Sequence, residues 1–328
     1  MTNWTFGAIL TLFNELTAVI LIGGLFMFSV HVLLFNKRTR LLRRDYRKLK
    51  EKEVKSKEVL QQRNLLQSRT KNIEDSLKYA QRIQTALFTT PREMRALFPE
   101  SFIFQRPKDI VSGDFYWARK INGKVMFSVA DCTGHGVPGA FMSLIGLEFF
   151  RQIVVEKQIL QPATILNEMN HYFDIVFGNL EELSLKDGMD LAFCAYDYEK
   201  RTLEYAGAFN SVYIIRNNEI LVVKGDRIIV GPDYGIQRGL FQNKLVQLEE
   251  NDVLYMFSDG YADQFGGPEG KKFKYRRFRH LLMTIHKLPM EEQHRKLEEN
   301  INEWMGGRHD QIDDQMVIGI RPASFSSS

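Results

Sequence analysis

Residues 17–35 form a continuous apolar run that contains no Asp, Glu, Lys or Arg. A helix of this length spans the roughly 30 Å hydrocarbon core of a bilayer. A cleaved signal peptide fits less well, because no basic region precedes the run and no small-residue cleavage site follows it. Two interpretations remain: a membrane anchor and a buried core helix.

A block of basic residues follows the apolar run directly and favours the membrane anchor. Basic residues accumulate on the cytoplasmic side of membrane helices. We therefore expect a single-pass protein of the cytoplasmic (inner) membrane, with the rest of the chain in the cytoplasm. The block consists of Lys37, Arg38, Arg40, Arg43, Arg44 and Arg47.

The net charge of the 328-residue chain is only +4. Most of this excess is local, since residues 37–57 hold eleven Lys and Arg against three Asp and Glu. The remainder is close to neutral or acidic, so the charge indicates no nucleic-acid partner. The two cysteines, Cys132 and Cys194, give no disulfide framework and fit a reducing compartment.

Residues 41–87 lack Gly and Pro and are rich in helix-forming residues, so they are expected to be helical, with Pro91 marking the end. Seven residues in this stretch alternate four and three apart, which is the period of a coiled coil weakened by two polar members. We interpret it as a parallel homodimeric signalling helix; a solvated helix packed on its own domain is the alternative. The seven are Leu66, Thr70, Ile73, Leu77, Ala80, Gln84 and Leu87.

From residue 98 onward, short strand-like runs alternate with turns, and the turn Asn217-Asn218 indicates a hairpin. Two strand-rich stretches enclose a helical pair, which predicts an α+β domain: a β-sandwich flanked by helices. We divide the chain into an anchor (1–36), a helical linker (37–90), a globular domain (91–322) and a disordered tail (323–328). The expected strands are 124–130, 191–197, 202–206, 211–216, 219–223, 244–247, 253–258 and 316–321, and the expected helices are 138–157, 163–177 and 276–305.

Aspartates recur in turns flanked by Gly or Ser, each beside an apolar run. They are Asp114, Asp131, Asp259 and the pair Asp313-Asp314. A single aspartate in such a turn is usually a cap. When several strand ends converge, however, their carboxylates need a cation to offset repulsion, and hard oxygen ligands select Mg²⁺ or Mn²⁺ over zinc. The shared pattern predicts a metal-dependent enzyme.

Six motifs together resemble the metal-dependent PPM serine/threonine protein phosphatases, in the bacterial branch typified by the sporulation stage II E phosphatase. The resemblance covers about residues 82–322 and implies an α-β-β-α sandwich. Six motifs in the expected order are far more specific than any one alone. They are Ser-Gly-Asp-Phe-Tyr (112–116), Ala-Asp-Cys-Thr-Gly-His-Gly-Val-Pro-Gly-Ala-Phe-Met-Ser (130–143), Asp-Gly-Met-Asp (187–190), Ala-Gly-Ala-Phe-Asn (206–210), Ser-Asp-Gly-Tyr-Ala-Asp-Gln (258–264) and Asp-Asp-Gln (313–315).

The resemblance implies a site for two Mn²⁺ or Mg²⁺ ions. By it, Asp114 is the ligand of the first motif, Asp131 bridges both ions and is catalytic with Asp114, and Cys132 contributes its backbone carbonyl. Asp259 and Asp313 would bind the second ion, with Asp314 replacing Asp313 if the register shifts by one. Gly134, like the other motif glycines, would let the backbone approach the ions closely.

Other residues have weaker assignments. Thr133 stands where the eukaryotic branch has a proposed general-acid histidine, and His135 fits a structural role, so the general acid is unassigned. Arg106 and Lys108 either contact the substrate phosphate or are surface charges, and Asp190 is a supporting polar residue beside the site. Residues 266–274 have the composition of an exposed flap suited to substrate docking.

The leading functional hypothesis is a membrane-anchored phosphatase that hydrolyses phosphoserine or phosphothreonine on a partner protein. The resemblance implies that the partner is a phosphorylated anti-sigma-factor antagonist or a related small regulator. A catalytically inactive membrane-tethered signalling scaffold is the alternative. An enzyme for nucleotides or small phosphates is a third, disfavoured because no Gly-x-x-x-x-Gly-Lys-Ser/Thr loop is present.

Overall fold

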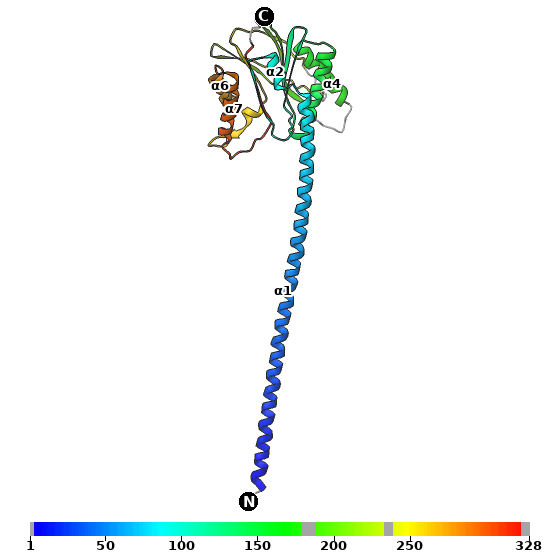
Figure 1. Cartoon of the computed structure of the whole chain (residues 1–328), viewed down its shortest axis with the longest axis vertical. Coiled ribbons are helices and arrows are strands. Elements are labelled where there is room, and N and C mark those ends of the chain that lie inside the picture. Colours follow the sequence, from blue (N-terminus) through cyan, green and yellow to red (C-terminus); the bar gives the residue numbers. More distant parts are fainter. Residues whose placement is uncertain (1–2, 179–187, 233–238, 323–328) are drawn as a thin grey trace. The chain divides into compact units, whose positions relative to one another are not determined.

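The computed structural model describes residues 3–178, 188–232 and 239–322, and the tail expected to be disordered (323–328) lies outside them. The chain separates into two compact units, Met1–Ile73 and Glu74–Ser328. Helix α1 (Asn3–Leu87) forms the first unit and continues into the second (Figure 1). The helix expected over 41–87 is therefore confirmed, and it is continuous with the apolar run.

The apolar side chains of residues 17–35 are exposed along α1: Leu21, Phe28 and Leu33 each keep about two-thirds of their surface accessible. Two helical stretches among the described residues are long and apolar enough to cross a membrane. In the first, Gly7–Leu97, the apolar window has a mean hydropathy of 2.5 and none of it is buried. The second, Gly136–Glu156, is 44% buried and packs against a sheet of the domain, as a core helix does.

Helix α1 ends at Leu87, and Pro91 opens the next helix, α2 (Pro91–Leu97). Proline suits the first helical position, where its missing N–H has no intrahelical partner. Thr90 caps the helix in a reciprocal arrangement with Glu93: its backbone N–H donates to the Glu93 carboxylate (2.7 Å), and its hydroxyl accepts from the Glu93 N–H (3.2 Å).

Two five-stranded antiparallel sheets form the centre of the second unit. In the first sheet the order is β1 (Ser101–Arg106), β12 (Gln315–Ile320), β9 (Val253–Phe257), β6 (Val212–Arg216) and β7 (Glu219–Val223). In the second it is β2 (Phe115–Ile121), β3 (Lys124–Cys132), β4 (Met189–Asp197), β5 (Thr202–Ala208) and β8 (Lys244–Gln247). Every expected strand is present, whereas β1, β2 and the small hairpin β10 (Phe265–Gly266)–β11 (Lys271–Lys272) were not predicted.

Helices cover the outer face of each sheet, so the predicted sandwich is confirmed with four layers, α-β-β-α (Figure 1). Helices α3 (Gly136–Phe150) and α4 (Pro162–Phe177) pack on the second sheet around Phe150 and Phe193. Helices α6 (Lys274–Ile285) and α7 (Met290–Met305) pack on the first sheet. Val125, Ile214 and Met256 belong to the core between the sheets.

Two of the expected helices are divided. The helix expected over 276–305 is the separate pair α6 and α7, because Pro289 lacks the N–H that a continuing helix needs and stands as the N-cap of α7. The helix expected over 138–157 changes from α3 into a π-helix, η1 (Arg151–Glu156). A four-residue helix, α5 (Gly260–Asp263), follows β9.

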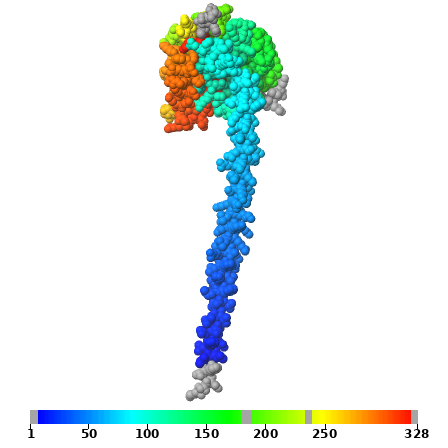
Figure 2. Space-filling model, in the orientation of Figure 1, coloured from blue at the N-terminus to red at the C-terminus, as the bar shows by residue number. Residues whose placement is uncertain are grey.

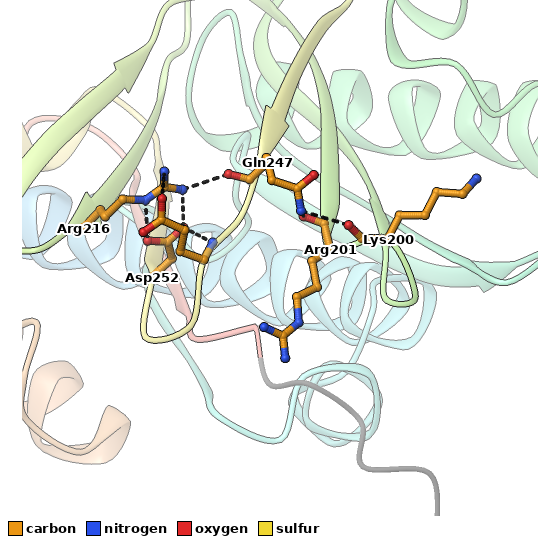
Figure 3. A network of polar contacts seen from close by, with 6 residues as sticks. Lys200, Arg201, Arg216, Gln247 and Asp252 are labelled. Atoms are coloured by element: carbon orange, nitrogen blue, oxygen red, sulfur yellow. Dashed lines mark hydrogen bonds and ion pairs between the residues drawn. The ribbon is translucent and has the colours of Figure 1, made fainter.

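An ion pair within the first sheet lies at the start of β9, and its arginine also reaches the second sheet (Figure 3). The Arg216 guanidinium, at the end of β6, donates two hydrogen bonds to the carboxylate of Asp252, at 2.9 and 2.7 Å. It also donates to the carbonyl of Gln247 in β8 (2.8 Å), whose amide in turn donates to the carbonyls of Lys200 and Arg201. Asp252 is only 1% exposed, so its charge depends on this partner.

Replacing Arg216 with alanine is expected to lower the free energy of unfolding by about 2 kcal/mol. The substitution leaves a buried carboxylate without its cation. For fully buried pairs this costs about 3–5 kcal/mol of the free energy of unfolding. We expect a smaller loss here because a quarter of the Arg216 side chain is exposed. Thermal or denaturant unfolding measures the change. Lys200→Ala is the control, since its ion pair with Asp197 is exposed; equal effects of both substitutions would contradict the argument.

Candidate active site

The pairing of β3 with β4 places two carboxylates opposite each other at the end of the second sheet. Asp131 lies directly across from Asp190, and Cys132 across from Met189. Asp114 immediately precedes β2, whose first residue, Phe115, pairs with Ala130 of β3. Three sequence motifs therefore meet at one end of this sheet.

The first sheet brings two further aspartates to the same place. Asp259 follows the end of β9, and its backbone N–H faces the Asp131 carboxylate at 3.4 Å. Asp313 precedes β12, the strand that pairs with β9. The five carboxylates of Asp114, Asp131, Asp190, Asp259 and Asp313 thus come from both sheets, as a site between strand ends requires.

Burial and mutual repulsion oppose ionisation of these carboxylates. Burial raises the pKa of Asp114 well above the usual range, and the negative charge of Asp131 raises it further. Burial also raises the pKa of Asp131 well above the usual range, and the negative charge of Asp259 raises it further. Burial and then the charge of Asp259 raise the pKa of Asp190 to about 6. Burial, with the charges of Asp263 and Asp313, also raises the pKa of Asp259. A cluster of this kind is stabilised in its charged form by cations.

The chemistry of the cluster fits hard divalent cations. Its side-chain donors are carboxylate oxygens, and the buried Asp114 Oδ2 has no hydrogen-bond partner within the described residues. Burial and the neighbouring Asp131 charge raise the pKa of the Cys132 thiol well above its usual range, so its sulfur is not available as a thiolate. Among the described residues, no three or more His, Cys, Asp or Glu side chains are placed closely enough to hold a metal ion; the carboxylates influence one another through their charges.

The adjacent aspartates 313 and 314 have different surroundings. Both carboxylate oxygens of Asp314 accept backbone hydrogen bonds, from Lys108 and Gly113, each at 2.7 Å. The negative charges of both aspartates raise the pKa of Asp114, but of the two only Asp313 also raises the pKa of Asp131 and of Asp259. Asp314 therefore fixes the loop that precedes Asp114, and Asp313 has the position suited to a ligand.

Two glycines permit close approach of the backbone around the carboxylates. A Cβ atom on Gly260, which follows Asp259, would lie 1.9 Å from the Asp314 carbonyl oxygen. Gly134 adopts φ +85°, a conformation that side chains disfavour. The close approach at Gly260 therefore joins the motifs around 260 and 314.

Arg106 and Lys108 are directed away from one another. Arg106 donates to the Asn302 side chain of α7 at 2.7 Å, so it contacts α7 instead of the carboxylates. The Lys108 ammonium lies 2.8 Å from Nε2 of His135, whose Nδ1 is 2.7 Å from the Asp109 carboxylate. Lys108 and His135 are thus parts of an exposed polar chain, as the structural interpretation of His135 expects. Asp187, the first residue of the 187–190 motif, lies outside the described residues.

A residue from α1 also contacts the loop before Asp114. The Gln84 side chain accepts a hydrogen bond from the Ser112 N–H (3.1 Å) and donates to the Ser112 carbonyl (2.7 Å) and the Ser143 hydroxyl (3.0 Å). Gln84 is 5% exposed, so it belongs to the domain interior and not to an accessible coiled-coil seam. Its polar side chain at an otherwise apolar seam position was the available sequence signal.

The structural comparisons agree with this architecture. The SiaA-PP2C domain of Pseudomonas aeruginosa matches with 33% identity and a TM-score of 0.69, covering 77% of this chain and 98% of that chain. The PP2C phosphatase domain of SpoIIE from Bacillus subtilis, with a fragment of its regulatory domain, matches with 18% identity and a TM-score of 0.55, covering 68% and 62%. The RsbU and RsbW domains of a Mycobacterium tuberculosis protein give 16% identity and a TM-score of 0.52, covering 69% and 60%.

The sequence comparisons identify the family. A search of curated proteins finds no match. The profile of Stage II sporulation protein E (SpoIIE), however, matches residues 121–322, which include the turns with Asp131, Asp259 and Asp313. With the similarity to the SiaA-PP2C domain, this match places the whole sandwich in one group. The chain therefore belongs to the SpoIIE family of PP2C-type serine phosphatases.

Proposed function

We propose that this chain is a membrane-anchored protein phosphatase that hydrolyses phosphoserine or phosphothreonine on a regulatory partner protein. The observation that carries the proposal is the buried group of carboxylates from both sheets, which raise one another's pKa. Such a group is costly unless it holds cations, and phosphoryl transfer is catalysed mainly by positioned charge. Membership of a phosphatase family agrees with this chemistry.

The proposed ligands of two Mn²⁺ or Mg²⁺ ions are the carboxylates of Asp114, Asp131, Asp259 and Asp313 and the carbonyl of Cys132. When bound, the ions would supply a water of lowered pKa and neutralise charge on the phosphoryl oxygens. Asp314 holds the loop carrying Asp114 in place through the N–H groups that it accepts. The Ser258 side chain lowers the pKa of Asp114 against the larger effect of burial, which indicates that it lies beside this carboxylate.

The N-terminal part of the proposal is an anchor over residues 1–36 in the cytoplasmic membrane and a linker over 37–90 that pairs two copies. The exposed apolar side chains of α1 support the anchor, because an apolar surface of this extent requires a nonpolar partner. The basic block after residue 36 supports a cytoplasmic phosphatase domain over 91–322. For the partner, we propose a phosphorylated regulator of the anti-sigma-factor antagonist type, as the sequence resemblance implies.

Phosphate release by the full chain in detergent tests the proposal. The protein is first treated with a chelator, then given Mn²⁺ or Mg²⁺ with phosphoserine and phosphothreonine peptides, p-nitrophenyl phosphate or ATP. We expect cation-dependent release from the peptides and none from ATP. Absence of turnover on every substrate favours the inactive scaffold, and preferential turnover of ATP favours a nucleotide enzyme.

Replacing Gln84 with alanine is expected to destabilise the phosphatase domain by about 1–3 kcal/mol and to raise the Mn²⁺ concentration needed for half-maximal activity. The change leaves the buried N–H and carbonyl of Ser112 without their partner, and this loop leads directly to Asp114. Thermal unfolding and a Mn²⁺ titration measure the two effects. Gln81→Ala is the matched control, since the Gln81 side chain is exposed; a Gln84 variant indistinguishable from it would refute this role.

A further inference from the structure

A groove of about 940 Å³ lies between helices α6 and α7 on the outer side of the first sheet. These helices form the orange-to-red surface of the domain in Figure 2. The residues of α6 supply most of its lining, and α7 contributes Asn300 and Trp304. None of the described residues that line the groove is acidic.

The rim of the groove is positively charged. Lys274, Arg276 and Arg277 are exposed, and none of the three forms an ion pair within residues 3–178, 188–232 and 239–322. The Arg277 guanidinium lies over the Trp304 ring, 4.7 Å from its centroid, which holds its charge at the groove. Unpaired cations on one rim produce a local positive potential that favours an acidic ligand.

The floor of the groove is apolar. Phe273, Leu281 and Trp304 supply apolar and aromatic surface. Such a surface binds apolar side chains, which a simple anion lacks, so the lining suits a polypeptide that carries acidic side chains.

The groove is close to the carboxylate site. Phe273 packs edge-to-face on Tyr261 at 5.5 Å between centroids, and Tyr261 follows Asp259 by two residues. Tyr275 lies between the groove residues 274 and 276. Burial raises its pKa, and the negative charges of Asp259 and Asp263 raise it further, so Tyr275 is near the carboxylate site. The β10–β11 hairpin, part of the segment expected to be an exposed flap, contacts a residue of the groove: the Gly267 N–H donates to the Trp304 carbonyl at 2.7 Å.

We propose that the groove between α6 and α7 binds an acidic segment of the phosphoprotein substrate. The inference rests on the proposed phosphatase function and extends it by naming the class of substrate. Carboxylates of the segment would face Lys274, Arg276 and Arg277, and an apolar side chain would contact Trp304. The phosphorylated residue would then lie beside the segment, toward Asp259.

Two phosphoserine peptides that differ only in four residues test the groove. One carries four glutamates beside the phosphoserine, and the other carries four glutamines. We expect the Mn²⁺-loaded full chain in detergent to show about tenfold higher kcat/KM on the acidic peptide, the effect of two or three exposed charge pairs. Raising the ionic strength from 0.05 to 0.5 M should remove most of this preference.

The variant Arg276→Gln/Arg277→Gln should reduce the preference to about twofold without changing kcat/KM on the neutral peptide or on p-nitrophenyl phosphate. Arg276→Gln alone, which keeps the Arg277–Trp304 contact, should have an intermediate effect. Arg119→Gln/Lys120→Gln removes two exposed charges from β2 and is the matched control. Turnover of both peptides without a preference overturns the groove proposal, whereas absence of all cation-dependent turnover overturns the phosphatase function itself.

Discussion

Asp131→Asn is expected to lower cation-dependent phosphate release from phosphoserine peptides by about 10³-fold. Asp131 lies between Asp190 of its own sheet and Asp259 of the other, and it is the proposed bridge between two ions. An amide keeps the shape of the side chain but loses its negative charge. Losing about 4 kcal/mol of transition-state stabilisation from a metal centre corresponds to this change in rate.

The control for this substitution is Asp310→Asn. Asp310 is exposed and lies three residues before Asp313, so the change alters the same number of charges near the site without touching the carboxylate group. We expect near wild-type activity from it. Retention of more than a tenth of the activity by Asp131→Asn, with a normal Mn²⁺ titration, would remove Asp131 from the proposed centre.

The metal-free protein is expected to lose stability as the pH rises from about 4 to 7, and Mn²⁺ is expected to reverse the loss. Asp114, Asp131 and Asp190 have pKa values above those in the unfolded chain, so the folded state binds more protons in this window and is favoured at its lower end. For Asp190, whose pKa rises from 3.8 to about 6, the loss is about 1–2 kcal/mol after solvent screening. A cation at 100 times its Kd returns about 2.7 kcal/mol.

Thermal unfolding at several pH values, with chelator or with Mn²⁺, measures both effects. The variant Asp190→Asn should reduce the slope of the metal-free profile, because one of the three titrating side chains is removed. Asp310→Asn should retain the wild-type slope. If the metal-free profile is already flat, or if Mn²⁺ stabilises the protein equally at pH 4 and pH 7, the carboxylates do not repel one another as described.

The strands recognised from sequence are those bounded by clear turns, such as β6 and β7 around Asn217-Asn218. Strand β2 escaped recognition because its first four residues are all buried and show no alternation. Phe115 and Trp117 face the helices, whereas Tyr116 and Ala118 face the other sheet. A strand covered on both sides has no polar face to reveal its period.

The residues of the candidate site that could be predicted from the sequence are those that stand in short motifs. Asp114, Asp131, Asp259 and Asp313 stand in recognisable turns, and the fold brings them together. The separate roles of Asp313 and Asp314 follow only from which backbone N–H groups reach each carboxylate. The contact of Gln84 with Ser112 spans 28 positions of the chain and depends on how α1 docks, which no local pattern encodes.

Strand β9 has Asp252 before its first residue and Asp259 after its last, and these carboxylates lie at opposite ends of the sandwich. At the Asp252 end, Arg216 connects the two sheets, since it donates to Asp252 of the first and to the Gln247 carbonyl of the second. At the Asp259 end, the neighbouring carboxylates of the two sheets repel one another, and bound cations would offset this repulsion. If the proposed cations bind, they would also hold this end of the sandwich together. Amide hydrogen exchange after chelation should then become faster around Asp131 and Asp259 while the Arg216 end stays protected.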